Sequence, residues 1–400
     1  MNPNSIRTLL NLFEEENLKK QAIDAVQSTD DPNLLQKVVD TLKAGNIEER
    51  IKDVLSKDAD AKRFIDKLAD IIVGIKAPVE EKNAFLKEFP QGIVNTDLLL
   101  DGQQHTFSEL VGPGFNTQLF KILTQVMVSQ GVGPGEVALA VLNPHIKWSG
   151  RAAGGGDIQV GSQSVEVKTS VAAGGRWINA RKATMDMTSI KTNISKAIFE
   201  SYKKKGQSID EAPPPELPAR LNPVAWVESF RPLIDPSLLD ACAKGMADGL
   251  FNHTDNSLYQ QALADGMPAQ IKEAILDVGF NNYKSYSHFD GILMMDLKTE
   301  VAQYFKDYAS MKGSIKTGTT YIYAPESEAM PQVVLMDTMG GTTSSGDDQV
   351  NPVAPAGPAT QTAPDDLDAV AQQRSGVTAA AGGVGKKLGS EKTLGRKRQR

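Results

Sequence analysis

The chain has 400 residues, a formal net charge of −6, a hydrophobic fraction of 40% and a charged fraction of 23%. These values are typical of an ordinary globular protein with more than one domain, and the acidic balance excludes a general attraction to nucleic acid. A single cysteine, Cys242, and four scattered histidines exclude an internal disulfide and a local Cys/His zinc cluster. Any site for a polyanion must therefore be local, and a soft transition-metal site is not expected.

The first hundred residues carry apolar side chains at helical spacing, from Ile6 to about Phe89. Asp31-Pro32 and Ala77-Pro78 are typical helix starts, and Gly45-Asn46 is a typical stop. We therefore predict an all-helical N-terminal module over residues 1–100, for contacts or oligomerisation. Because no apolar run is long enough to span a bilayer and the N-terminus lacks the order of a signal peptide, we expect no membrane partner and a cytoplasmic location.

An α/β region is predicted from about residue 105. A helical stripe that begins near Phe115 ends in a Gly-Pro-rich break, and EVALAVL from Glu136 predicts a short buried helix whose positive end favours that carboxylate. Strand patterns follow at 145–149, 157–160 and 164–169, and a helix with a basic outer face is expected over 189–205.

The second half of the chain changes character twice. A proline-rich joint at 212–218 opens a stretch of helical pattern, which predicts a helical insertion over 206–284. Strand patterns return at 289–295, 320–324 and 332–336, and these would complete the sheet, giving an α/β core over 105–205 and 285–338. Residues 339–400 are low in large apolar side chains and predict a disordered tail, whose basic end is a candidate for binding nucleic acid or an acidic protein surface.

The stretch GGGDIQVGSQSVEVK, residues 154–168, predicts a β-hairpin. Side chains alternate along a strand, so Glu166 and Lys168 would share one face while Val165 and Val167 would face the core. The turn would bring Glu166 back beside Asp157. The three glycines before Asp157 would let a nucleic-acid strand approach it closely.

Two carboxylates that converge in this way repel each other unless a cation lies between them. A hard divalent ion such as Mg²⁺, or Mn²⁺, takes oxygen ligands of this kind and keeps several waters. The ion would polarise a phosphodiester and activate a water, and the lysine would orient that water or stabilise charge on the phosphate. The pattern therefore predicts a metal site at Asp157 and Glu166 and the chemistry of phosphodiester hydrolysis.

These residues resemble the PD-(D/E)XK nuclease superfamily, the restriction-endonuclease-like fold. The order of Glu136 on a helix, a strand, a Gly-Gly-Asp strand, the Glu-x-Lys strand and a helix is especially similar to archaeal Holliday-junction resolvases. The resemblance covers roughly residues 115–205 and implies a mixed central sheet flanked by helices. It implies that Asp157 and Glu166 bind Mg²⁺, that Glu136 assists directly or through water, and that Lys168 positions the nucleophilic water. Gly156 stands where the motif name has proline.

Other acid-x-Lys triplets occur in the chain. Asp60-Ala61-Lys62 and Glu80-Glu81-Lys82 lie in helical pattern, where we interpret them as solvated faces. Asp296-Leu297-Lys298, with Asp290 upstream, ends an apolar strand and is the real rival; it ranks second because no turn pairs its two acids. The alternative interpretation of the first site is a surface ion pair between Glu166 and Lys168 and a turn residue at Asp157.

A loop after the hairpin supplies candidate contacts to nucleic acid. Arg176, Arg181 and Lys182 are candidates for phosphate contacts, and Trp177 is a candidate for stacking on a base or for packing under the loop.

The leading hypothesis is an Mg²⁺-dependent DNA endonuclease, with a homodimer as one way to cut two strands. The alternative is a structural or assembly protein of phage type, located in a virion, that keeps a nuclease-like fold for binding nucleic acid without cleavage. A nucleotide-binding enzyme is disfavoured because no phosphate-binding Gly-x-x-x-x-Gly-Lys-Ser/Thr loop occurs.

Overall fold

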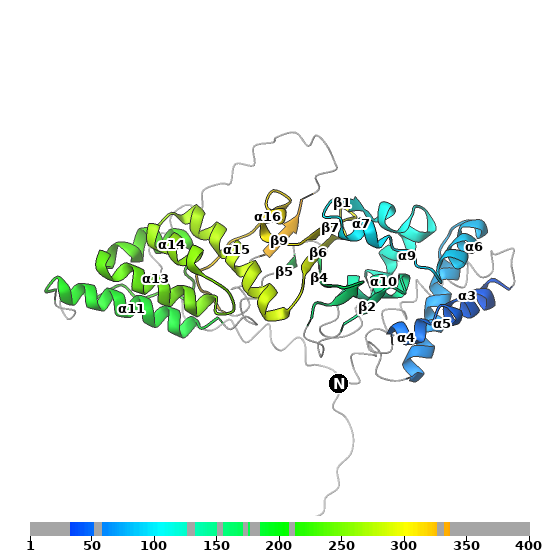
Figure 1. The fold of residues 1–400 in the computed structure, drawn as a ribbon, viewed down its shortest axis with the longest axis horizontal. Helices are drawn as coiled ribbons and strands as arrows, with labels where there is room; N and C mark the ends of the chain where they lie inside the picture. The colour runs from blue at the N-terminus through cyan, green and yellow to red at the C-terminus, as the bar shows by residue number, and fades with distance from the viewer. Residues whose placement is uncertain are drawn as a thin grey trace, which may run out of the picture. The chain divides into compact units, whose positions relative to one another are not determined.

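The structure is a computed structural model. It describes residues 33–51, 58–125, 133–149, 155–170, 175–176, 185–207, 213–325 and 332–336 (Figure 1). The predicted helix near Ile6 and the predicted disordered tail, 339–400, lie outside these residues.

The N-terminal region is helical, as its sequence predicts. Apolar side chains at helical spacing, such as Val38 and Leu68, are buried in one core, and most charged positions between them face outward. The stop predicted at Gly45-Asn46 is present, with Gly45 as the C-cap of the first described helix. The helices are α3 (Leu34–Ala44), α4 (Ile47–Ile51), α5 (Asp58–Gly74) and α6 (Val79–Glu88).

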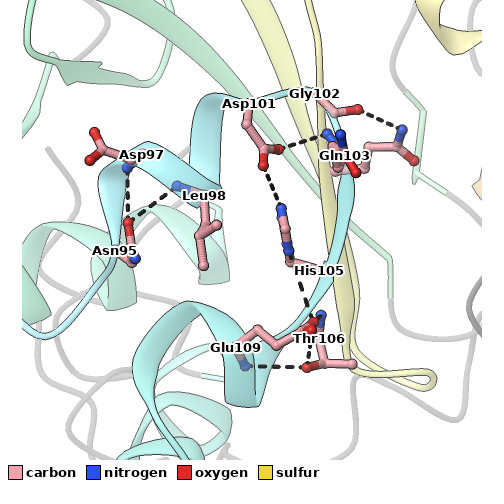
Figure 2. A network of polar contacts seen from close by, with 10 residues as sticks. Asn95, Asp97, Leu98, Asp101, Gly102, Gln103, His105, Thr106 and Glu109 are labelled. Carbon is pink, nitrogen blue, oxygen red and sulfur yellow. Dashed lines mark hydrogen bonds and ion pairs between the residues drawn. The ribbon is translucent and has the colours of Figure 1, made fainter.

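A compact polar network connects the helical region to the first strand (Figure 2). The Asn95 side chain accepts hydrogen bonds from two backbone N–H groups at the start of one helix, and Thr106 and Glu109 form a reciprocal capping box at the start of the next. The ring of His105 contacts Asp101 at 2.8 Å. The elements are α7 (Thr96–Leu100), β1 (Gln104–Thr106), α8 (Phe107–Val111) and α9 (Phe115–Leu123).

The centre of the fold is a mixed six-stranded sheet, in the order β1-β7-β6-β4-β3-β2. Only β4 and β6 pair in parallel; the other neighbours are antiparallel. The strands predicted near 145, 157, 164 and 289 are present, whereas the sequence patterns did not indicate β1 or β7. The elements are α10 (Pro134–Leu142), β2 (Ile146–Trp148), β3 (Ile158–Val160), β4 (Gln163–Ser170), β6 (Gly291–Asp296) and β7 (Val301–Phe305).

The parallel register of β4 and β6 decides what lies on each face of the sheet. Val167 pairs with Leu293, and both are buried in the core that α10 and the N-terminal helices share. Glu166 pairs with Ile292, and Ile292 is buried against the long helix α15 (Pro268–Ser287). The face that carries Glu166 is therefore the face that α15 covers.

Helices between β4 and β6 form a core of their own. Ile194 on α11 packs into the same apolar cluster as Trp226, Met246 and Tyr259. The helix expected over 189–205 and the helical pattern expected after residue 206 are thus both present, while the domain boundary between them stays a prediction. The elements are α11 (Met187–Lys204), α12 (Pro223–Ala225), the π-helical turn η1 (Trp226–Phe230), the 3₁₀ turn η2 (Arg231–Leu233), α13 (Pro236–Leu250), α14 (Ser257–Asp265) and α15.

Of two strand predictions near the end of the α/β region, one was wrong and the other was right about the strand but wrong about its sheet. Residues 320–324 form no strand: Tyr323 makes a single bridge with Leu221, and both side chains are buried in the helical core. Residues 332–336 do form a strand, but it belongs to a separate antiparallel sheet in the order β5-β9-β8. The apolar residues in these two stretches indicated that they are buried, but they did not indicate which part of the fold they pack against. The remaining elements are β5 (Gly175–Arg176), α16 (Tyr308–Met311), β8 (Ile315–Thr317) and β9 (Gln332–Leu335).

Candidate active site on the β3–β4 hairpin

The predicted hairpin is present and has a two-residue turn. Val160 pairs with Gln163, and Gly161 between them has φ +61°, as the first central position of a type II′ turn requires. The register that pairs Ile158 with Val165 continues toward Asp157 and Glu166. The hairpin therefore returns β4 alongside Asp157, as its sequence predicts.

Gly156 is a glycine because β4 passes too close for any side chain. A Cβ at this position would lie 2.5 Å from the carbonyl carbon of Val165 and 2.8 Å from the Glu166 nitrogen. The Gly156 N–H also donates to the Ser164 hydroxyl at 2.6 Å. The space at Gly156 is thus filled by the protein's own backbone, so its interpretation as room for a nucleic-acid strand was wrong.

Asp157, Glu166 and Lys168 converge, as the alternation along β4 predicts. The Lys168 ammonium makes an ion pair with Glu166 Oε1 and lies 3.9 Å from Asp157 Oδ2. Asp157 Oδ2 also accepts a hydrogen bond from the Val167 N–H at 2.9 Å, which fixes the carboxylate against β4. Val165 and Val167 are buried on the opposite face, as expected.

The Glu166–Lys168 pair is not a surface ion pair. The side chain of Glu166 is 8% exposed and that of Lys168 is 19% exposed. Burial acts to lower the pKa of the Lys168 ammonium, but Tyr283, Glu166 and Asp157 outweigh it and raise that pKa above its usual value. Lys168 is therefore held as a cation between two carboxylates in a largely dehydrated place.

Glu136 lies in the first turn of α10, where its sequence places it. Its Oε1 accepts a hydrogen bond from the Gly133 N–H at 2.5 Å, and its Oε2 accepts one from Trp148 Nε1 at 3.1 Å. Burial and then the negative charge of Asp157 raise the pKa of Glu136 to about 8. Glu136 thus both caps the first turn of α10 and responds to the charge of Asp157.

Tyr283 on α15 is a member of the site that sequence reasoning missed. Its hydroxyl donates a hydrogen bond to Glu166 Oε1, the oxygen that Lys168 also contacts. Burial, with a further contribution from Glu166, raises the pKa of Tyr283 above its usual value, so the hydroxyl keeps its proton. The only available signal was indirect: a parallel β4–β6 pair requires a crossover, and α15 is the helix that immediately precedes β6.

The acids of the rival candidate, Asp290 and Asp296, do not come together to form a comparable site. Asp296 Oδ1 accepts hydrogen bonds from the backbone N–H groups of Lys298 and Thr299, so this carboxylate closes the turn after β6. Asp290 lies at the other end of that strand, where it accepts from the Ser164 N–H at 2.8 Å. Each acid thus has a local structural role.

The helical triplets require one correction. Glu80-Glu81-Lys82 lies on α6 as expected, but Lys82 is buried, at 2% exposed, and its ammonium donates to the Val73 carbonyl. Its interpretation as part of a solvated face was therefore wrong. Asp60-Ala61-Lys62 falls in α5, and its side chains lie outside the described part of the chain.

The candidate nucleic-acid contacts cannot be placed with the rest of the site. Trp177, Arg181 and Lys182 lie outside the described residues, and for Arg176 only its backbone in β5 is described. Their roles stay predictions.

The carboxylates around Lys168 are donors of the kind that Mg²⁺ prefers. Among the residues that the structure describes, no three His, Cys, Asp or Glu side chains are grouped so as to hold a metal ion. Mg²⁺, however, commonly uses one or two carboxylates together with waters and substrate phosphate. Burial and, after it, the negative charge of Asp157 raise the pKa of Glu136, so a cation close to Asp157 would lower that pKa again. Asp157 and Glu166 therefore fit a two-carboxylate Mg²⁺ site.

Comparison with known proteins gives no family for the chain. No family model, no curated protein and no solved structure matches it. Within the described residues, none of the helices is both long and apolar enough to cross a bilayer. The function must accordingly be argued from the site itself.

Proposed function

We propose that the protein is a metal-dependent endonuclease that hydrolyses DNA phosphodiester bonds at Asp157, Glu166 and Lys168. One observation carries the proposal: a lysine ammonium lies between two carboxylates in a partly buried place, and one of those carboxylates is held by the strand that carries the lysine. Buried charges of this kind are costly and are more frequent at functional sites than elsewhere.

The order of elements supports the resemblance to PD-(D/E)XK nucleases. Glu136 lies in the first turn of α10, Asp157 immediately precedes β3, and Glu166 and Lys168 lie on β4. A parallel partner for β4, reached through helices, makes the central sheet mixed. The resemblance was based on this order of a helix that carries Glu136, a strand that follows Asp157, and a strand that carries Glu166 and Lys168.

Mg²⁺ bound by Asp157 and Glu166 would polarise the phosphodiester and lower the pKa of a bound water. Asp157 is suited to hold a cation because the Val167 N–H fixes its orientation. Lys168 is suited to orient a water or to stabilise the charge on the phosphate, because its ammonium keeps its proton beside the two carboxylates. Glu136, whose pKa is raised to about 8, is suited to hold a proton at neutral pH and release it when a cation approaches Asp157.

The test is incubation of the purified protein with linear, circular and branched DNA in Mg²⁺. We expect cleavage by the wild type and its loss in Asp157→Ala and in Lys168→Ala. Asp296→Ala is the matched control, because it removes a carboxylate from the neighbouring strand and should leave cleavage intact. If Asp296→Ala abolishes cleavage while Asp157→Ala does not, the site is misplaced.

A second function, nucleic-acid binding without cleavage in a structural or assembly protein, is favoured by one observation. Glu166 Oε1 already has two partners within the protein, the Lys168 ammonium and the Tyr283 hydroxyl, so this oxygen is engaged without a metal ion. Binding of all three DNA forms without cutting, in Mg²⁺ and in Mn²⁺, would support this function over the nuclease.

A further inference from the structure

Tyr283 occupies a place that packing alone does not explain. Its side chain is buried, with its ring 5.1 Å from that of Phe289 in an edge-to-face contact, so the ring has an apolar partner. Its hydroxyl, in contrast, is directed at Glu166, and the Lys168 ammonium lies 5.7 Å from the centre of its ring. One side chain thus touches both charged members of β4.

The end of α15 is fastened to the hairpin that carries the site. Lys284, the next residue on the helix, donates to the backbone carbonyls of Asp290 and Lys306 at 2.7 and 3.1 Å. The helix then ends at His288, whose φ of +55° places it in the left-handed conformation of a C-cap. The segment after the helix is therefore held in one path.

Ser164 completes this connection from the side of the hairpin. Its N–H donates to the Asp290 carboxylate, and its carbonyl accepts from the Asp290 N–H at 2.7 Å. Its hydroxyl accepts from the N–H of Gly156, the residue before Asp157. The loop that carries Asp157, the start of β4 and the end of α15 thus share one set of hydrogen bonds, which fixes Tyr283 relative to the acids.

We propose, resting on the nuclease function proposed above, that Tyr283 is a positioning residue that holds Glu166 ready for a divalent cation. Its hydroxyl engages Oε1 together with Lys168, so the carboxylate has a fixed orientation. Hydrogen-bonded partners of metal-binding carboxylates commonly act in this way, and their loss typically weakens metal binding roughly 10–100-fold. The helices between β4 and β6 would then take part in the site through Tyr283.

The test compares Tyr283→Phe with Tyr286→Phe. The first removes the hydroxyl that reaches Glu166 and keeps the ring beside Phe289 and Lys168. The second removes a hydroxyl from an exposed tyrosine on the same helix, whose ring lies 5.0 Å from that of His253. Titration of each full-length protein with MgCl₂ by calorimetry, without DNA, measures the affinity for the ion itself.

We expect Tyr283→Phe to bind Mg²⁺ about tenfold more weakly than the wild type, and Tyr286→Phe to bind it equally well. In the cleavage assay, the Mg²⁺ concentration for half-maximal rate should rise by the same factor while the KM for DNA stays unchanged. A Tyr283→Phe protein with wild-type Mg²⁺ affinity would overturn the inference and leave the nuclease function standing. A wild-type protein that neither binds Mg²⁺ nor cuts DNA would overturn both.

A metal-free measurement covers the case in which Tyr283→Phe also alters folding. Unfolding free energies of Tyr283→Phe, Glu166→Ala and the double variant should be non-additive, because both single changes remove the same hydrogen bond. Additive shifts would show that the hydroxyl does not hold Glu166 and would overturn the inference.

Discussion

The β3–β4 hairpin and helix α6 each bury a lysine from an acid-x-Lys triplet, and the two lysines are in opposite situations. The Lys168 ammonium meets Glu166 and Asp157, which raise its pKa against the effect of burial. The Lys82 ammonium meets the Val73 carbonyl, and burial lowers its pKa. An acid-x-Lys triplet thus forms a charged site on the β3–β4 hairpin, whereas on α6 its lysine contacts a backbone carbonyl near the end of a helix.

The difference follows from the geometry of the two secondary structures. On a strand, residues two apart point to the same side, so the first acid of the triplet can meet the lysine. On a helix, residues two apart do not face each other, so Glu80 and Lys82 point to different sides. A triplet therefore indicates a site only when it lies on a strand and a second acid is brought to it, as Asp157 is.

The sharpest way to test this comparison is to replace each lysine by methionine. Lys168→Met should lower the rate of DNA cleavage roughly 10²–10⁴-fold, because it removes the cation that acts on the water or the phosphate. Lys82→Met should leave the rate unchanged and lower the free energy of unfolding by about 1 kcal/mol, because the Val73 carbonyl loses its donor. Cleavage assays and urea denaturation measure both. Equal loss of activity in the two variants would break the comparison.

A second test concerns the close approach that forms the hairpin site. Gly156→Ala should lower the free energy of unfolding by about 3 kcal/mol, because the new Cβ would meet the backbone of β4. Gly161→Ala is the matched control: nothing lies within 4 Å of its Cβ, and only its positive φ is unfavourable, which costs about 1 kcal/mol. Similar losses in the two variants would contradict the account of Gly156.

The raised pKa of Glu136, which follows first from burial and then from the charge of Asp157, should appear as a pH dependence of stability. The folded protein raises the pKa of Glu136 from 4.5 to about 8, so it binds more protons than the unfolded chain between these values. Its stability should therefore fall as pH rises through this window. Relative to Glu136→Gln, the wild type should lose about 4 kcal/mol between about pH 5 and about pH 9. A difference that is constant with pH would contradict the raised pKa.

The smallest effect is expected at the rival triplet. Asp296→Ala should cost about 1 kcal/mol of unfolding free energy, because two backbone N–H groups in the turn after β6 lose their acceptor. Its cleavage rate should equal that of the wild type. Loss of cleavage with unchanged stability would move the site to Asp296.

The local part of the site was predictable because it depends on the alternation of side chains along a strand and on a residue type that favours a tight turn. Val165 and Val167 alternate with Glu166 and Lys168, and Gly161 marks the turn, so the hairpin follows from adjacent residues. The helices of the N-terminal region follow in the same way from their apolar spacing.

The rest depended on contacts between distant segments. Tyr283 reaches Glu166 across 117 positions of sequence, and nothing in its own neighbourhood distinguishes it from Tyr286. Gly156 is required by a strand that passes beside it, which a glycine run alone does not reveal. Residues 320–324 are apolar enough for a strand but find their partner in a helical core. Local sequence patterns predict which residues are buried, whereas the tertiary fold determines which residues they pack against.

The most direct test of the central claim is to locate a divalent ion in crystals grown with Mn²⁺, through its anomalous scattering. The account predicts one strong peak in contact with the carboxylates of Asp157 and Glu166, beside the Lys168 ammonium. A peak at Asp290 or Asp296, or an unoccupied hairpin site with the Glu166–Lys168 pair intact at saturating Mn²⁺, would contradict it.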